Sequence, residues 1–148
     1  MKKKLIIVGA VVLLVALVVV KMVVLKPPPP DEAKLAKEPG ITYTMPDPFV
    51  VNLADGGGTP HFVKVGVALR FSKLSEGEVV KGEGDKPDTV EEAAELRDIV
   101  ISTLQSKTSG QLSTADGRDS VKKSIVERVN KHTDYTIVDV YYTEFAVQ

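Results

Sequence analysis

The first 26 residues constrain this chain more than any other segment. Residues 2–4 are lysines, and an apolar run follows over residues 5–25, in which Lys21 is the only charge. As a helix of about 21 residues at 1.5 Å per residue, this run reaches roughly 31 Å, close to the thickness of a bilayer's hydrocarbon core. The sequence therefore predicts a single transmembrane helix over residues 5–25, preceded by a short stub over residues 1–4.

A secretory signal peptide also begins with positive charge, but it needs small residues at its cleavage site. Residues 18–23 are instead branched or long side chains, so we expect an uncleaved anchor. A core helix is the other alternative, but a helix this apolar would leave a small soluble domain with an uncovered apolar face. Lysines lie on both sides of the run and do not orient it. Because the stub is short, we expect it in the cytoplasm and the part after residue 27 in the periplasm, on a single-pass inner-membrane anchor.

Composition excludes several classes of site. Cysteine is absent from the 148 residues, which rules out disulfides, thiolate metal ligands and thiol catalysis. The formal net charge is −1, and lysines are concentrated before residue 40, so the part that follows is acidic. Phosphate binding needs clustered basic residues, and we therefore expect no nucleic-acid partner.

A linker separates the anchor from the domain. Residues 27–30 are four prolines, which favour polyproline II and form a stiff post of roughly 12 Å. Residues 31–40 are charged and end in Pro-Gly, as either a short frayed helix or a plain linker. We assign residues 26–40 to the linker and residues 41–148 to one domain of a size that supports a single core.

The first half of this domain reads as two strands. Residues 41–53 form a strand broken by the proline bend at residues 46–48. In residues 61–71 every second side chain is apolar, which is the clearest strand pattern in the chain. The glycines at residues 56–58 predict that the two strands pair as an antiparallel hairpin. Residues 72–88 are acidic and glycine-bearing, and we expect an exposed loop with a short helical turn.

Two helices and a strand follow. Residues 89–92 read as a capping box that opens a helix ending near residue 107, where Ser-Gly stops it. A second helix begins at residues 114–117, and both helices have apolar residues at spacings of three and four. The last strand, residues 135–147, has apolar side chains on both parities, so we expect both of its faces to be covered. The predicted class is α+β, in the order β-β-α-α-β, with helices packed on an antiparallel sheet.

No pattern indicates chemistry. His61 and His132 have no spacing relation that makes a metal pair or a base and nucleophile. The three glycines lack the Lys-Ser/Thr of a phosphate loop, and no paired-acid or G-x-S-x-G motif occurs. We therefore expect no catalytic, cofactor-binding or metal-binding residues, no cofactor and no enzyme activity.

Several segments carry a family resemblance. Residues 96–108, 112–118 and 125–130 match in order and spacing, and residues 49–53 and 138–148 look like the family's opening and closing strands. Together with the anchor and the proline-rich link, they make the chain resemble the flagellar basal body-associated protein FliL family.

The resemblance implies a fold like that of stomatin and prohibitin proteins. It also implies a non-enzymatic motor protein at the flagellar basal body, which forms a homo-oligomeric ring around stator units and supports torque for motility. Its implied partners are stator proteins, further copies of itself and the membrane. Arg97, Asp98 and Arg118 lie in the matched segments and are the candidates for polar contacts. Alternatively, Arg97 and Arg118 pair with nearby acids such as Glu127 or Asp119.

A second function comes from a different class. An envelope adaptor outside the flagellar motor would bind a peptide or protein by adding a strand to a sheet edge. A long unpaired edge beside an apolar groove would favour the adaptor, and complementary opposite faces would favour the ring. An enzyme of unrecognised type would need a deep pocket that gathers several titratable groups.

Overall fold

The computed structural model describes residues 31–148. The predicted stub, the predicted transmembrane helix and the prolines at residues 27–30 lie outside the described residues. Among the residues that are described, no helix is both long enough and apolar enough to cross a membrane. Glu32–Gln148 form one compact unit.

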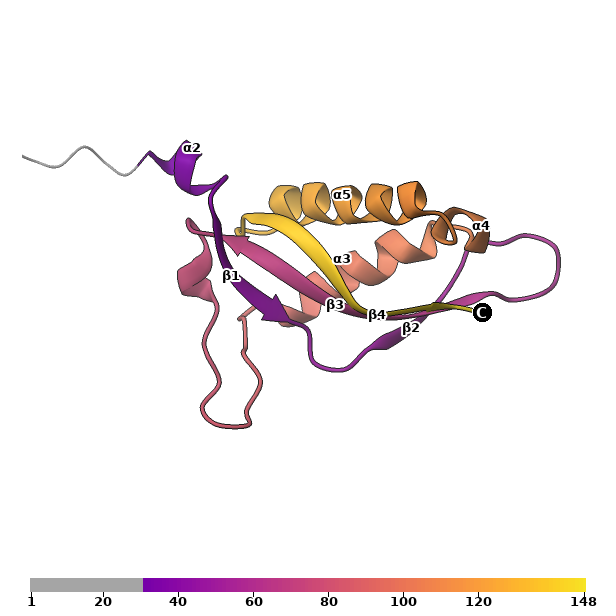
Figure 1. Cartoon of the computed structure of the whole chain (residues 1–148), viewed down its shortest axis with the longest axis horizontal. Coiled ribbons are helices and arrows are strands. Elements are labelled where there is room, and N and C mark those ends of the chain that lie inside the picture. The colour runs from indigo at the N-terminus through magenta and orange to yellow at the C-terminus, as the bar shows by residue number, and fades with distance from the viewer. Residues whose placement is uncertain (1–30) are drawn as a thin grey trace, which may run out of the picture. The chain divides into compact units, whose positions relative to one another are not determined.

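This unit is an α+β domain in which helices cover one face of an antiparallel sheet (Figure 1). In chain order its elements are helix α2 (Glu32–Leu35), strands β1 (Pro39–Thr44), β2 (Phe49–Asn52) and β3 (Phe62–Ser72), the 3-10 turn η1 (Glu76–Glu78), helices α3 (Ala93–Gln105), α4 (Ser109–Leu112) and α5 (Ala115–His132), and strand β4 (Ile137–Val147). The predicted order is confirmed, with the first strand divided in two and α4 added between the long helices.

The sheet is built around β3. Strands β1 and β2 pair antiparallel with its two halves along one edge, because Thr44 lies opposite Ala68 and Phe49 lies opposite Val65. The predicted antiparallel hairpin is therefore confirmed, and so is the bend that divides its first strand into β1 and β2. Asp47 takes the bend with a φ of 60°. Strand β4 pairs antiparallel with β3 along the other edge.

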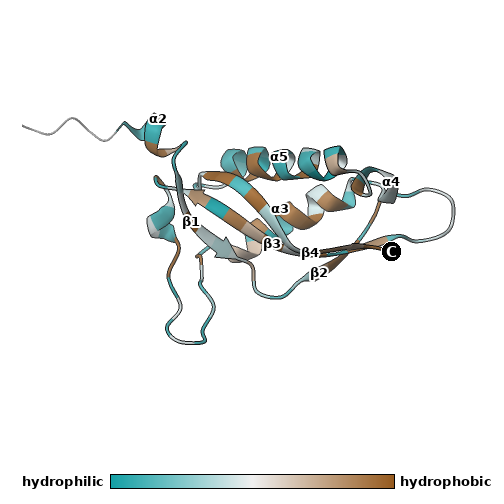
Figure 2. Cartoon of the chain, viewed as in Figure 1, coloured by the Kyte–Doolittle hydropathy of each residue, from teal (hydrophilic) through white to brown (hydrophobic). Residues whose placement is uncertain are grey.

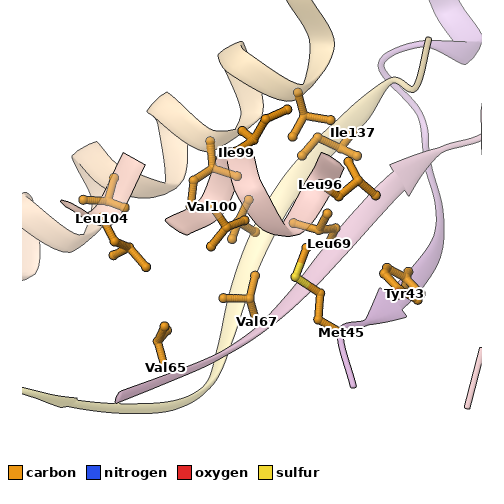
Figure 3. Packing of buried hydrophobic residues seen from close by; sticks show 14 of the residues in the cluster. Tyr43, Met45, Val65, Val67, Leu69, Leu96, Ile99, Val100, Leu104 and Ile137 are labelled. Carbon is orange, nitrogen blue, oxygen red and sulfur yellow. The ribbon is translucent and has the colours of Figure 1, made fainter. Parts of the chain in front are cut away.

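The core lies between the sheet and the two long helices (Figures 2 and 3). Alternate side chains of β3 point into it, and five of them are fully buried: Val63, Val65, Val67, Leu69 and Phe71. The helices bury most of the residues that their spacing predicted, which are Leu96, Val100 and Leu104 in α3 and Val121, Ile125 and Val129 in α5, whereas the predicted Ala93 is only partly buried. Each such side chain contributes roughly 1.5–3 kcal/mol when it leaves water.

The expectation that both faces of β4 are covered is wrong. Its register against β3 shifts twice, between the partners of Gly66 and Val67 and between those of Arg70 and Phe71. Each shift inserts an extra residue and reverses the parity of the strand. Apolar residues of both parities therefore face the helices, and they lie opposite the inward residues of β3: Ile137, Val140, Tyr142, Phe145 and Val147.

Gly66 makes room for the bulge at Thr143. A Cβ added there would collide with the hydroxyl oxygen of Thr143, the extra residue of β4. A side chain at residue 66 would force the Thr143 hydroxyl to move and would lie 3.3 Å from the backbone nitrogen of Glu144, so this close approach favours glycine.

The predicted capping box at residues 89–92 is also wrong. Thr89 forms an isolated antiparallel bridge with Val80, and α3 begins only at Ala93, with no side-chain cap from Glu92. The backbone pairing of Thr89 takes it out of the helix. The chain does contain a capping box, but it is formed by Thr108 and Gln111 at the start of α4, where Ser-Gly was expected to end a helix.

The predicted start of the second long helix is confirmed. The hydroxyl oxygen of Thr114 accepts a hydrogen bond from the N–H of Gly117 at 3.1 Å and caps α5. A Cβ at Gly117 would collide with the carbonyl oxygen of Gln111. Gly117 is therefore a position where the backbone of α4 leaves no space for a side chain.

Gly66→Ala should lower the free energy of unfolding by about 1–3 kcal/mol, because the added methyl group overpacks the bulge. Urea unfolding followed by circular dichroism measures the change. Gly56→Ala is the matched control, since a Cβ at Gly56 meets nothing within 4 Å. Equal stability of Gly66→Ala and Gly56→Ala would contradict this role of Gly66.

Candidate functional site

Arg97 holds the β1–β2 bend against α3. Its guanidinium lies 4.5 Å from the ring centre of Phe49, and its Nη1 donates hydrogen bonds to the carbonyl oxygens of Pro46 at 3.0 Å and Asp47 at 3.5 Å. The side chain thus satisfies the carbonyls of a turn that carries a positive φ. Its stem lines a small hollow of about 140 Å³ between β1 and the first turn of α3.

Arg118 is used in a similar way at the other end of the domain. Its Nη1 donates to the carbonyl oxygens of Leu112 at 3.0 Å and Ser113 at 3.1 Å, at the end of α4. Its guanidinium also lies 5.9 Å from the ring centre of Phe145 in β4. The arginine therefore ties α4, α5 and β4 together. The alternative that Arg97 and Arg118 pair with Glu127 or Asp119 is wrong, because both bond backbone carbonyls instead.

Asp98 differs from the two arginines because it points to solvent. It shares the exposed side of α3 with Glu95, three positions earlier, and the exposed Glu91 lies in the turn just before the helix. Within the part of the chain that the structure describes, none of these three carboxylates takes part in an ion pair. We call Glu91, Glu95 and Asp98 the acidic stripe. Of the three candidate contact residues, Asp98 is thus the one whose side chain makes no hydrogen bond or ion pair within the described part of the chain.

A second surface feature lies beside β4. A hollow of about 250 Å³ opens between α5 and the start of that strand, lined by Lys122, Lys123, Val126, Glu127, Val138 and Asp139. The ammonium of Lys122 lies 5.3 Å from the ring centre of Tyr142, whose pKa burial raises to about 12. We call this space between α5 and β4 the β4 hollow. No local pattern in the sequence indicates this hollow, because Val138 and Asp139, which complete it, lie about 15 positions after Lys123.

Asp55 fastens the glycine-rich turn to the helices, a contact that the sequence did not indicate. The N–H and the hydroxyl of Ser109 both donate to its carboxylate, each at 2.7 Å. These hydrogen bonds lower the pKa of Asp55. The contact closes the β2–β3 connection against the start of α4. Its two members are 54 positions apart, and the only local sign is an acid that precedes the glycines.

Glu92 is a carboxylate whose pKa is shifted in the opposite direction from that of Asp55. Its Oε2 is buried and has no hydrogen-bond partner among the described residues. Burial first, and then the charges of Glu95, Asp134, Glu91 and Glu78, raise the pKa of this carboxyl. The backbone N–H of Glu92 donates to the hydroxyl of Tyr135 at 3.2 Å, which fixes the residue at the start of α3.

Groups that could carry chemistry are not gathered in one place. Among the described residues, no three His, Cys, Asp or Glu side chains lie close enough to hold a metal ion. His61 precedes β3, and His132 ends α5. What the structure does show is an α+β domain in which the two candidate arginines stabilise the fold.

Comparisons with known proteins identify the family of this α+β domain. The family model described as "Flagellar basal body-associated protein FliL" matches residues 42–148. The chain is also 32% identical over 112 residues to "Flagellar protein FliL" of Aquifex aeolicus (strain VF5), a match that covers 75% of this chain and 63% of that relative. The match thus spans less than two thirds of the relative's length. The chain belongs to the FliL family, a family of flagellar basal body-associated accessory proteins that are not known as enzymes.

Asp55→Ala should lower the urea midpoint at pH 7, because the folded state loses the two hydrogen bonds to Ser109. The pKa of Asp55 is lowered on folding, so this stabilisation is present above the unfolded pKa and is lost as the pH falls through the folded one. The difference between the variant and the wild type should therefore disappear in acid. Asp85→Ala in the exposed loop is the control, and an equal shift in both variants would contradict the assignment.

Glu92→Gln should have the opposite sign at neutral pH. The pKa of Glu92 is raised on folding, so its ionised form destabilises the domain above the folded pKa, and this penalty fades as the pH falls. The variant should therefore unfold at a higher urea concentration than the wild type at pH 8, and the gain should shrink toward pH 4. The exposed neighbour Glu91→Gln is the control. A gain that does not depend on pH would show that the carboxylate is not the cause.

Proposed function

We propose that this chain is a single-pass inner-membrane protein of the flagellar motor, whose C-terminal domain forms a periplasmic ring around stator units and supports torque. Residues 1–4 are the cytoplasmic stub, residues 5–25 the anchor, residues 26–40 the linker and residues 41–148 the domain. The family match over residues 42–148 is the observation that carries the proposal, since it places the chain at the flagellar basal body. The apolar run at residues 5–25 supports the membrane attachment.

The way in which the linker enters the domain fits a scaffold. The carboxylate of Glu38 lies 3.0 Å from the ammonium of Lys73, and the N–H of Lys73 donates to the carbonyl oxygen of Glu38 at 2.9 Å. A Cβ at Gly40 would meet the backbone of Ser72, so the chain also packs closely just after Glu38. These contacts fasten the end of the linker to β3. The free length between the anchor and the domain is then shorter than residues 26–40, which limits how far the domain can move from the membrane.

The shape of the domain supports the ring. A ring of identical subunits needs two different surfaces on each subunit, one for each neighbour. One side of the domain is formed by the β1–β2 edge of the sheet together with α3, and the other side by the β4 edge together with α5. The acidic stripe lies on the exposed side of α3 and in the turn before it, and Lys122 and Lys123 border β4.

One observation favours the adaptor outside the motor as a second candidate. The β4 hollow lies beside a strand edge that pairs with no other strand in the described chain, and a peptide added to that edge could place a side chain in the hollow. The adaptor would use one edge of the domain, whereas the ring would use both.

The two candidates differ in what accompanies the protein. The tagged full chain, extracted gently from membranes of flagellated cells, should co-purify with stator proteins in an assembly much larger than one subunit. Mass spectrometry and sizing of the same sample measure both properties. An untagged strain is the control. A single subunit without motor components, despite intact stators in the starting membranes, would contradict the motor proposal and favour the adaptor.

A further inference from the structure

We infer that neighbouring copies in the proposed ring join edge to edge, with β4 and α5 of one copy against β1, β2 and α3 of the next. This inference rests on the proposed function and deepens it, because it names the surfaces that meet. The occupant of the β4 hollow is then a second copy of this chain.

Two open strand edges are the first argument. Strand β4 pairs only with β3, and within the described residues β1 and β2 also have β3 as their only partner. An open edge presents unpaired N–H and C=O groups, which form a template for another strand. A copy that docks its β1–β2 edge against β4 of a neighbour covers both open edges at once. A foreign peptide bound at β4 would leave the β1–β2 edge open.

The direction of the strands is the second argument. Strands β1, β2 and β4 all run antiparallel to β3, so they run in the same direction as one another. Copies related by rotation keep the same direction along the ring axis, and β4 of one copy therefore meets β1 and β2 of the next in parallel. This contact repeats around a ring. Two β4 edges would meet antiparallel about a two-fold axis, and that contact stops at two copies.

The helix layer is the third argument. Because α5 packs along β4 and α3 packs along β2, the same contact brings α5 of one copy beside α3 of the next. Lys122 and Lys123 then face the acidic stripe of the neighbour, whose carboxylates have no ion-pair partner among the described residues. Glu127 and Asp139 also line the β4 hollow, so the match depends on where the two lysines lie and not on the net charge of the rim.

One end of β4 is closed to such pairing. Asn130 covers the backbone of Ile137, because its Nδ2 donates to the carbonyl oxygen at 3.0 Å and its Oδ1 accepts from the N–H at 2.7 Å. The amide thus takes the place of a neighbouring strand at that residue. The N–H of Val140 is also taken, by the carboxylate of Asp139 at 2.8 Å. Pairing with a second copy is therefore confined to residues 141–147 of β4, beyond the bulge at Val138.

Cross-linking between single introduced cysteines tests the contact, since the native chain has none. Full chains that carry Asp98→Cys or Lys123→Cys, each with its own tag, are expressed together and treated in membranes with a short bis-maleimide. We expect a mixed dimer at several times the yield of either self-linked dimer, and a ladder of larger products from the double variant. Lys131→Cys is the matched control, because this lysine is exposed on the same helix but does not line the β4 hollow.

The outcomes separate the contact from the ring itself. Self-linked dimers alone, or equal yields with Lys131→Cys, would overturn the edge-to-edge contact. The edge-to-edge contact would also be overturned if the wild-type chain formed an assembly of full size but the Asp98→Cys and Lys123→Cys chains did not cross-link. The ring itself would then stand. A wild-type chain that forms no assembly would overturn the ring, and the contact with it.

Discussion

The apolar face of β3 is the constraint on which the rest of the domain depends. Its inward side chains from Val63 to Phe71 are fully buried and form the floor of the core under α3 and α5. Because every second residue of a strand faces the same side, all other elements must bring their apolar groups to this one face. Strands β1, β2 and β4 and both long helices do so, and the opposite face of β3 carries small or polar residues such as Gly66, Ala68 and Arg70.

The same constraint explains which parts of the fold the sequence could predict. Strand β3 and the buried faces of α3 and α5 follow from local spacing, and so does the cap of Thr114 on α5. The two bulges of β4 do not, because they depend on a partner strand about 75 positions earlier in the chain, where Gly66 leaves room for Thr143. Thr89 was misread for a similar reason, since its bridge to Val80 closes a loop and competes with a helix start that looked favourable locally.

Candidate contact residues were harder to predict than the core. Arg97 and Arg118 were chosen because they lie in the segments that carry the family resemblance, but a resemblance does not show whether a side chain points out or bonds its own backbone. Both do the latter, to carbonyl groups on turns and helix ends. Asp98 remains a candidate because it is exposed beside other acids. The contact between Asp55 and Ser109 and the β4 hollow both join distant segments, so neither leaves a local pattern in the sequence.

These features together fit the proposed role of this protein as a scaffold that stays in a fixed position. The family assignment puts it at the flagellar basal body, and the described domain combines a well-packed core, a fastened linker and two open edges. The central proposal is that such domains encircle the stator units. Electron cryotomography of motors in cells tests it most directly, by comparing cells that express the full chain with cells in which residues 41–148 are deleted. Our account predicts a ring of density around the stators that is lost on deletion. An unchanged density around stators that are still present would contradict it.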